Sequence, residues 1–201
     1  MNSTNTNTDS IVQRIREGDF VAVQDDANRE DETDLVIAAE AITDKQMAFL
    51  IRYTSGIIAV PMKRGRLQEL KLDLLTEQNT ANFGTPFTMP VDLSAGTRGG
   101  VSAHERVLTI KALINIQTAP EDLGRPGHIF PLEAHAGGLA ERVGHTEAAL
   151  YLMEQAEMYP AAVIGELMNN DGTMMRGDAL NAFLAIHSIP LVTISELREM
   201  L

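Results

Sequence analysis

The feature that most constrains the fold of this chain is the shortness of its apolar runs. Residues 35–39 and 56–62 are typical of these runs, which are far shorter than the roughly 20 residues of a membrane span. Such runs are typical of buried strands, and segments with a helical spacing of apolar residues lie between them. Strands and helices follow in mixed order without a repeat or a low-complexity linker. We therefore expect one soluble α+β domain.

Polar, glycine-rich and proline-rich stretches set the expected boundaries. Residues 1–9 are polar and rich in Asn and Thr, so we interpret them as a frayed tail before a domain that spans 10–201. Residues 119–143 contain so many Pro and Gly that we expect a loop with one short strand near Ile129. The expected strands are 20–23, 35–39, 57–61, 161–166 and 191–194, and the expected helices begin at or just after Ser10, Asp44, Ser102, Thr146 and Ala179. Ser102 with Glu105 three residues on predicts a capping box at the start of its helix.

Composition excludes several classes of protein. None of the 201 residues is cysteine, so disulfide scaffolds, thiolate zinc sites, iron–sulfur clusters and cysteine nucleophiles are ruled out. The 28 acidic and 16 basic residues give a net charge of −12, which repels nucleic acid and anionic membranes. We therefore expect neither as a partner, and an anionic substrate needs a local basic site. The lack of cysteine and of a signal peptide indicates a cytoplasmic protein.

The densest charge lies in an acidic segment between two expected strands, Asp25 to Asp34, with six carboxylates among ten residues. Glu30, Glu32 and Asp34 alternate, so in an extended chain they point to one side. Converging carboxylates bind divalent cations, and oxygen ligands favour Mg²⁺ or Mn²⁺. Arg29 lies inside the cluster and not at its edge. The alternative is a solvated acidic loop that binds nothing.

A second polar constellation, residues 142–147, precedes an expected helix. Free amide groups at a helix N-terminus bind phosphate, and Arg142 adds a bidentate cation. His145 is placed to complete a metal site or to shuttle a proton. The alternative is that Thr146 and Glu147 only start a helix and that His145 is a surface residue. Next to an acidic metal cluster, the pattern predicts a site for a sugar phosphate.

Two further residues have the chemistry of proton transfer. His128 follows Pro126 and Gly127 in an irregular segment, and histidines on loops are candidates for general acid or base catalysis. Glu166 ends an expected buried strand, where a carboxylate needs a partner or takes a raised pKa. The alternatives are a histidine that only caps a turn and a carboxylate that is structural.

Six short motifs follow one another in the order found in one enzyme family. They are D-D-x-x-R-E-x-E-x-D at 25–34, G-T-x-F-T at 84–88, V-S-A at 101–103, R-P-G-H-I-F-P-L at 125–132, G-H-T-E-A at 144–148 and E-x-M-N-x-D-G-T-M at 166–174. From about Arg14 to Leu197 the chain resembles 3,4-dihydroxy-2-butanone 4-phosphate synthase of riboflavin biosynthesis. That resemblance implies a three-layer α/β/α sandwich around a mixed β-sheet and a homodimer with active sites at the subunit interface. It implies a lyase that converts D-ribulose 5-phosphate to L-3,4-dihydroxy-2-butanone 4-phosphate and formate.

The resemblance also assigns roles to individual residues. Glu30 and His145 match the family's Mg²⁺ ligands, and Mn²⁺ is the alternative cation. Positions matching the family's substrate contacts are Arg29, Glu30, Asp34, Arg142, Thr146 and Glu166. His128 and Glu166 match positions required for catalysis, and Glu32 is a further carboxylate expected to move protons.

Five positions depart from the family's usual residues: Ala59 replaces Cys, Phe83 replaces Tyr, Gly99 replaces Thr, Glu105 replaces Asp and Glu133 replaces Arg. We expect most of them to line or border the pocket. Two alternatives to the synthase therefore stay open, a related enzyme for another sugar or ketone phosphate and a protein that binds a sugar phosphate without catalysis. No fused GTP cyclohydrolase II is expected, because the cysteines of its zinc site are absent.

Overall fold

The computed structural model describes the backbone of residues 3–201 and the side-chain environment from Asp9 onward. The strands are β1 (Val21–Gln24), β2 (Thr33–Ala38), β3 (Ile58–Met62), β4 (Val91–Leu93), β5 (Leu123–Glu133), β6 (Ala162–Glu166) and β7 (Leu191–Thr193). The helices are α1 (Ser3–Arg16), α2 (Asp44–Tyr53), α3 (Arg64–Glu69), α4 (Ala103–Ile114), α5 (Gly138–Glu141), α6 (His145–Gln155), α7 (Gly177–His187) and α8 (Ile194–Arg198), with a 3-10 turn at Pro120–Asp122.

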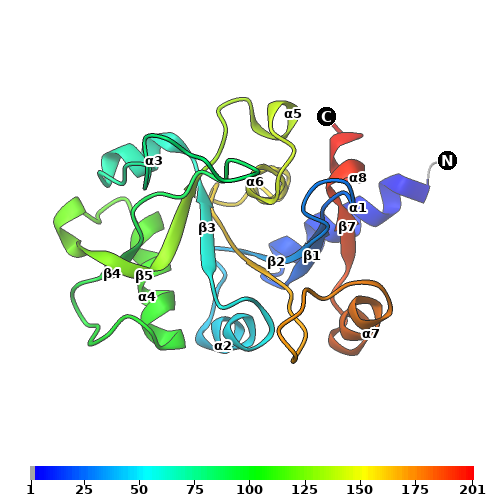
Figure 1. Ribbon diagram of the computed structural model, residues 1–201, viewed down its shortest axis with the longest axis horizontal. Helices are drawn as coiled ribbons and strands as arrows, with labels where there is room; N and C mark the ends of the chain where they lie inside the picture. Colours follow the sequence, from blue (N-terminus) through cyan, green and yellow to red (C-terminus); the bar gives the residue numbers. More distant parts are fainter. Residues whose placement is uncertain (1–2) are drawn as a thin grey trace.

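All seven strands form one mixed sheet in the order β4-β5-β3-β6-β2-β1-β7. Strand β2 is antiparallel to both β1 and β6, whereas β3 is parallel to β5 and β7 is parallel to β1. Helices α1, α6 and α8 cover one face, and α2, α4 and α7 cover the other (Figure 1). The predicted three-layer α/β/α sandwich around a mixed sheet is therefore confirmed.

The two faces of the sheet bury separate apolar cores, as the alternation of side chains along β2 shows. Leu35 and Ile37 pack in the core beneath α2, α4 and α7. Val36 and Ala38 point to the opposite face and pack against α1, α6 and α8. A central strand buried on both faces has no solvent-facing side on which polar residues would alternate, which explains the continuous apolar run that predicted it. None of the helices within residues 3–201 is both long and apolar enough to cross a bilayer.

Helix α1 begins earlier than the sequence predicted. It starts at Ser3 and not at Ser10, so the tail predicted over residues 1–9 is helical from Ser3 onward. No Pro or Gly interrupts residues 3–16, and buried Ile11, Val12 and Ile15 hold the helix against the sheet. Residues 1–2 lie outside the described part of the chain.

Strand β5 is the largest departure from the predicted elements. Pro and Gly indicated a loop with a short strand near Ile129, yet the strand runs for 11 residues from Leu123 to Glu133. Its register with β4 shifts between Val91 and Asp92, and such an irregularity accommodates breaking residues in a strand. At Gly127 a Cβ would lie 1.9 Å from the Val91 carbonyl carbon, so only glycine permits this close approach.

The predicted capping box of α4 is present. The Ser102 hydroxyl accepts the Glu105 amide proton at 3.2 Å, and Glu105 accepts hydrogen bonds from the Ser102 amide and hydroxyl. The Glu105 carboxylate also accepts from the Arg98 amide at 2.6 Å and the Gly99 amide at 3.3 Å. Two of the unusual positions, Gly99 and Glu105, therefore contact each other and organise the loop before α4.

These bonds predict how Glu105 affects stability with pH. The Arg98 amide, the Ser102 hydroxyl and the Gly99 amide lower the pKa of Glu105 from 4.5 to about 2. A lowered folded-state pKa stabilises the fold above the unfolded-state value and loses this effect as pH falls toward 2. Glu105→Gln should therefore lower the melting temperature at pH 7, and the difference from wild type should shrink below pH 4.5. Thermal unfolding followed by circular dichroism between pH 3 and 7 tests this, and a constant difference would contradict it.

Candidate active site

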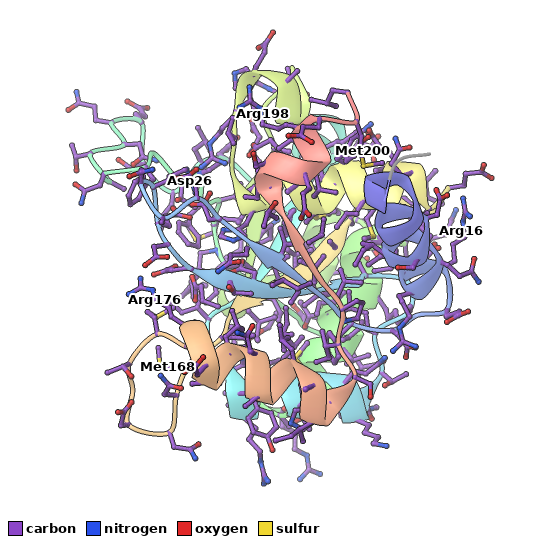
Figure 2. All side chains as sticks on the ribbon, turned by 90° about the vertical axis from the view of Figure 1, so that its right-hand side faces the viewer. Arg16, Asp26, Met168, Arg176, Arg198 and Met200 are labelled. Carbon is purple, nitrogen blue, oxygen red and sulfur yellow. The ribbon has the colours of Figure 1, made fainter. Side chains whose placement is uncertain are left out.

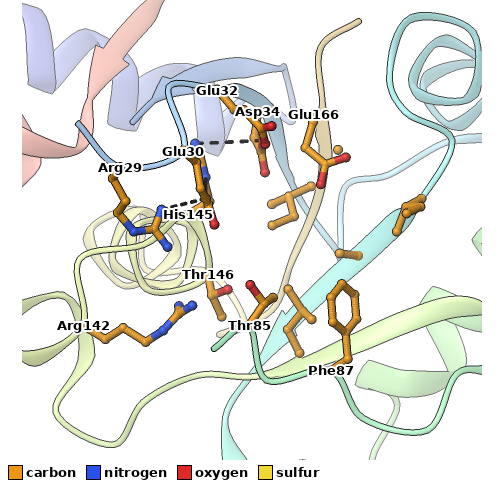
Figure 3. Close-up of a pocket in the computed structure, with 15 residues that line it drawn as sticks. Arg29, Glu30, Glu32, Asp34, Thr85, Phe87, Arg142, His145, Thr146 and Glu166 are labelled. Carbon is orange, nitrogen blue, oxygen red and sulfur yellow. Dashed lines mark hydrogen bonds and ion pairs between the residues drawn. The ribbon is translucent and has the colours of Figure 1, made fainter. Parts of the chain in front are cut away.

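A polar pocket lies where β2 begins and β6 ends, beside the start of α6 (Figure 3). It encloses about 510 Å³ of non-protein space, part of it open to solvent. Asp34 and Glu166 enter it from adjacent strands, because they are register partners in the antiparallel β2–β6 pair. Its polar lining residues are Arg29, Glu30, Glu32, Asp34, Thr85, Arg142, His145, Thr146 and Glu166. All but one of the predicted site residues therefore lie together.

The acidic segment folds as a tight turn around a buried carboxylate. One oxygen of Asp25, Oδ2, accepts hydrogen bonds from Arg29 Nη1 at 2.6 Å and from the Glu30 amide at 3.0 Å. Arg29 Nη1 also donates to Glu30 Oε2 at 2.6 Å. Asp31 completes the turn in the left-handed region, with φ at 53°. Asp25 and Arg29 thus fix the Glu30 carboxylate toward the pocket.

A residue from another part of the chain ties this turn in place. Arg176, at the N-cap of α7, donates from Nε to the Asp31 carbonyl at 2.5 Å and from Nη2 to the Glu30 carbonyl at 3.3 Å. It also pairs with the Asp31 carboxylate at 3.0 Å. Figure 2 shows Arg176 and Asp26, at the start of the turn, on the same side of the molecule. The acidic turn is thus anchored from both of its flanks.

His145 faces the acidic residues across the pocket. It is the first residue of α6, after Gly144 as N-cap, and only 7 % of it is exposed. Its Nδ1 lies 3.4 Å from Glu30 Oε2, and its Nε2 lies 3.9 Å from Asp34 Oδ1. The alternative of a surface histidine is therefore wrong. The helix expected to begin at Thr146 begins one residue earlier, at His145, with Gly144 as N-cap. The Thr146 side chain does not cap the helix and lines the pocket from its first turn.

Burial and mutual charge shift the pKa values of this group strongly. Burial alone would lower the pKa of His145, but Asp34, Glu30 and Asp25 outweigh it and raise the pKa to about 9. Burial raises the pKa of Asp34 to about 7, opposed by His145 and reinforced by Glu166 and Glu32. Burial, Glu166 and Glu30 also raise the pKa of Glu32. The site therefore favours a positive charge at its centre.

Three buried polar atoms in this group form no hydrogen bond: Asp25 Oδ1, Asp34 Oδ1 and His145 Nε2. One ligand atom from each of Asp25, Glu30 and His145 lies within 4.8 Å of the other two. Buried polar atoms without partners cost free energy, which a bound cation would recover. Carboxylate oxygens with one imidazole suit Mg²⁺ or Mn²⁺. The residues therefore fit a divalent cation.

Two arginines, Arg29 and Arg142, also line the pocket. Arg142 points toward Thr85 and Thr146 in Figure 3. The ring of Phe83 lies 5.2 Å from the Arg29 guanidinium carbon, and the Phe83 carbonyl accepts from Arg142 Nη2 at 3.4 Å. First-turn amide groups of α6 lie beside these cations, since Thr146 lines the same pocket. Guanidinium groups next to a helix N-terminus are suited to bind a phosphate.

Glu166 is held at the base of the pocket by Ser55. The Ser55 hydroxyl donates a short hydrogen bond to Glu166 Oε2, and the Ser55 amide donates to the Glu166 carbonyl at 2.9 Å. The prediction that Glu166 ends a buried strand is confirmed. The Ser55 hydroxyl thus fixes one carboxylate oxygen of Glu166, whose side chain lines the pocket.

His128 alone among the predicted site residues does not line this pocket. It lies on β5, with its side chain 45 % exposed, and its Nδ1 is 2.6 Å from Asp92 Oδ2. The His128 amide donates to the other Asp92 oxygen at 2.9 Å. Asp92 therefore fixes the orientation of the imidazole and leaves it facing solvent.

The five unusual positions lie in different surroundings. Ala59 lines the pocket, and Phe83 covers its two arginines. Gly99 and Glu105 belong to the α4 cap. Glu133 does not line the pocket, and its carboxylate lies 3.6 Å from the Arg64 guanidinium. The expectation that most of them line or border the pocket is therefore too broad.

Three residues that support this site were not singled out from the sequence. Asp25 and Glu147 lie inside the matching motifs at 25–34 and 144–148, but charge alone does not separate them from their neighbours. Ser55 precedes the expected strand at 57–61 and carries no local signal, because its partner Glu166 is 111 residues away in sequence. Only the folded structure shows which groups these three side chains contact.

Comparisons with known proteins agree with this geometry. The family model of 3,4-dihydroxy-2-butanone 4-phosphate synthase matches residues 9–200. Enzymes of that name from Cronobacter sakazakii and an Enterobacter species are 45 % and 46 % identical over 94 % and 92 % of this chain, covering 87 % and 85 % of their own lengths.

Solved structures agree as well. A synthase of this name in complex with two magnesium ions has a TM-score of 0.90 at 38 % identity, covering 94 % of this chain and 93 % of its own. The synthase from Candida albicans has a TM-score of 0.87 at 42 % identity, with 96 % and 95 % coverage. The chain therefore belongs to the 3,4-dihydroxy-2-butanone 4-phosphate synthase family.

Proposed function

We propose that this protein converts D-ribulose 5-phosphate to L-3,4-dihydroxy-2-butanone 4-phosphate and formate, with the pocket at the start of α6 as its active site. The observation that carries this proposal is the meeting of two opposite charge groups in one pocket. Arg29 and Arg142 line this pocket together with the carboxylates of Glu30, Asp34 and Glu166, and Arg29 joins the two groups through its bond to Glu30 at 2.6 Å. A phosphorylated sugar needs both, since its phosphate binds cations and its hydroxyl groups bind carboxylates or a metal.

Glu30 and His145 would hold a Mg²⁺ or Mn²⁺ ion at the acidic side. A related synthase has been crystallised with two magnesium ions, and the partnerless buried atoms here fit such a cation. When bound, the ion would polarise the ketone and hydroxyl oxygens of the sugar and stabilise the oxyanions that form as protons leave.

The residues opposite the phosphate would move the protons. Burial raises the pKa of Glu32, and it brings the pKa of Asp34 to about 7, so Asp34 exchanges a proton near neutral pH. Glu166, fixed by Ser55, would act as base or acid at the sugar carbons. Arg142, Thr146 and the α6 amides would hold the phosphate and set which carbon faces Glu166.

A formate assay tests the reaction directly. Purified protein with ribulose 5-phosphate and Mg²⁺ should release formate well above a control without enzyme, and EDTA should stop the release. A protein that only binds sugar phosphate would be stabilised thermally by ribulose 5-phosphate and yield no formate. Turnover of another sugar phosphate but not of ribulose 5-phosphate would indicate a related enzyme. Complementation of a riboflavin auxotroph would show the same activity inside a cell. We propose that the enzyme acts in the cytoplasm.

We further propose a homodimer in which each active site lies at the subunit interface. His128, expected in catalysis, faces solvent outside the pocket of its own chain. Ile57, at the pocket rim, and Val101 are 44 % and 52 % exposed, as expected for apolar residues that a second subunit covers. In the dimer, His128 of the partner subunit would complete the pocket.

Mixing two inactive variants tests the shared site. Glu30→Gln and His128→Ala each disable one component, so either homodimer should be inactive. A heterodimer would have one site with both components intact, and a random mixture should recover about a quarter of wild-type activity. The measurement is formate release after joint refolding, with size-exclusion chromatography to establish the dimer. No recovery from a mixture that forms dimers would contradict the shared site.

A further inference from the structure

A buried carboxylate without an assigned role lies directly behind the arginine side of the pocket. Glu147, in the first turn of α6, is 1 % exposed. Its Oε2 accepts a hydrogen bond from Arg142 Nη1 at 2.6 Å, and its Oε1 accepts the amide proton of His135 at 3.0 Å. Both oxygens are therefore satisfied by donors, as a buried charge requires.

We propose that Glu147 is a positioning residue that fixes the Arg142 guanidinium beside Arg29, so that the two cations bind one phosphate group together. This inference rests on the proposed function for the identity of the phosphorylated substrate. It assigns no step of the reaction to Glu147, which does not line the substrate pocket.

The backbone of Gly144 shows how closely these groups approach. A Cβ at this position would lie 2.7 Å from Arg142 Nη1 and 3.2 Å from Arg29 Nη2 and from Glu147 Oε2. Both guanidinium groups and the carboxylate thus meet over one glycine at the N-terminus of α6. Its φ of −141° is open to any residue, so the requirement for glycine here is one of space.

The guanidinium groups of Arg29 and Arg142 both lie next to Gly144 and repel each other, and the carboxylates paired with them offset that repulsion. Arg29 is paired with Asp25 and Glu30, whereas Arg142 is paired with Glu147. Without Glu147, Arg142 would move away from Arg29 into the solvent that reaches the pocket mouth. Arginine has five N–H donors, so the bond to Glu147 leaves others for a phosphate. Holding the long side chain in advance reduces the entropy lost on binding.

The variant Glu147→Gln keeps the size of the side chain and removes its charge. Its amide group can accept from only one of the two donors and carries no charge, so Arg142 loses its anionic partner. A smaller residue is less suitable, because Glu147 also borders a second cavity, with about 1000 Å³ of non-protein space partly open to solvent, that truncation would enlarge. We expect KM for ribulose 5-phosphate to rise about tenfold while kcat changes less than about threefold.

Binding of inorganic phosphate gives a readout that does not depend on turnover. Isothermal titration of the dimer with phosphate should show an approximately tenfold weaker Kd for Glu147→Gln. Added to Arg142→Ala, the same substitution should weaken binding no further, because the two residues act as one unit. The matched control is Glu154→Gln on the same helix, which loses only an exposed pair with Lys63 at 2.6 Å and should bind phosphate like wild type.

These experiments separate the positioning role from a merely structural one and from the proposed reaction. A structural role would lower the melting temperature and the active fraction but leave the phosphate Kd of the folded protein unchanged, which would overturn the proposal. If Glu147→Gln does not fold, Gly144→Ala replaces it, since the added methyl displaces Arg142 with Glu147 still present, and unchanged phosphate affinity there would also overturn it. Wild-type protein without formate release would refute the reaction but not the weakened phosphate binding.

Discussion

Glu30→Gln is expected to reduce formate release from ribulose 5-phosphate by about 10³-fold or more at saturating Mg²⁺, because metal stabilisation of developing charge contributes several kcal/mol. The substitution removes one negative oxygen from the group of Asp25, Glu30 and His145. It also leaves Arg29 with one carboxylate partner fewer. Initial rates at several Mg²⁺ concentrations should show the loss at every concentration, because the amide is a poor ligand.

The Glu30 variant also has a readout without substrate. Titration with Mn²⁺, followed by its paramagnetic resonance signal, should show affinity lowered by more than about tenfold. Glu40→Gln is the matched control, since Glu40 is exposed in the turn after β2, at the opposite end of the strand from the pocket. Wild-type Mn²⁺ affinity and turnover in Glu30→Gln would remove Glu30 from the metal site.

Glu166→Gln is expected to lower kcat by about 10² to 10⁴-fold and to change KM for ribulose 5-phosphate much less, as loss of a general acid or base does. The amide keeps the shape of the side chain and a bond to the Ser55 hydroxyl, but it cannot take up a proton. Steady-state kinetics on the purified protein measures both constants. Thermal unfolding of the same samples shows that the fold is retained.

A carboxylate at the end of another strand serves as the control for Glu166. Glu133 ends β5 as Glu166 ends β6, but it pairs with Arg64 and does not line the pocket. Glu133→Gln should leave kcat within about twofold of wild type, since such partly exposed pairs contribute little. A loss in Glu166→Gln confined to KM would assign Glu166 to substrate binding and would contradict a role in proton transfer.

Local signals predicted the elements that depend on neighbouring residues. The Ser102 and Glu105 pair specified the start of α4, because a capping box is complete within four residues. The apolar run before Glu166 placed that carboxylate at a strand end. The length of strand β5 was underestimated, with only a short strand expected near Ile129, because Pro and Gly break a strand in isolation, whereas in the sheet β4 shifts register beside them.

Contacts between distant segments required the structure. Asp34 and Glu166 meet because β2 pairs with β6, and nothing in either strand specifies that partner. The same holds for Ser55 beside Glu166, which is 111 residues away in sequence. Glu147 and Arg142 are near in sequence, but only the folded backbone turns their side chains toward each other. The resemblance brought His128 into the expected site, whereas the fold places it facing solvent on β5.

Arg176 grips the acidic turn through main-chain carbonyl oxygens of Glu30 and Asp31 as well as one side chain. Carbonyl groups are the same whatever residue carries them, so this anchor is indifferent to the side chain at position 30. Evolution or mutagenesis can therefore exchange the chemistry presented at that point while the chain keeps its path. The conformation of the turn is therefore held independently of the side chain at position 30. Loss of activity in a variant at this position then reflects the missing carboxylate and not a misfolded turn.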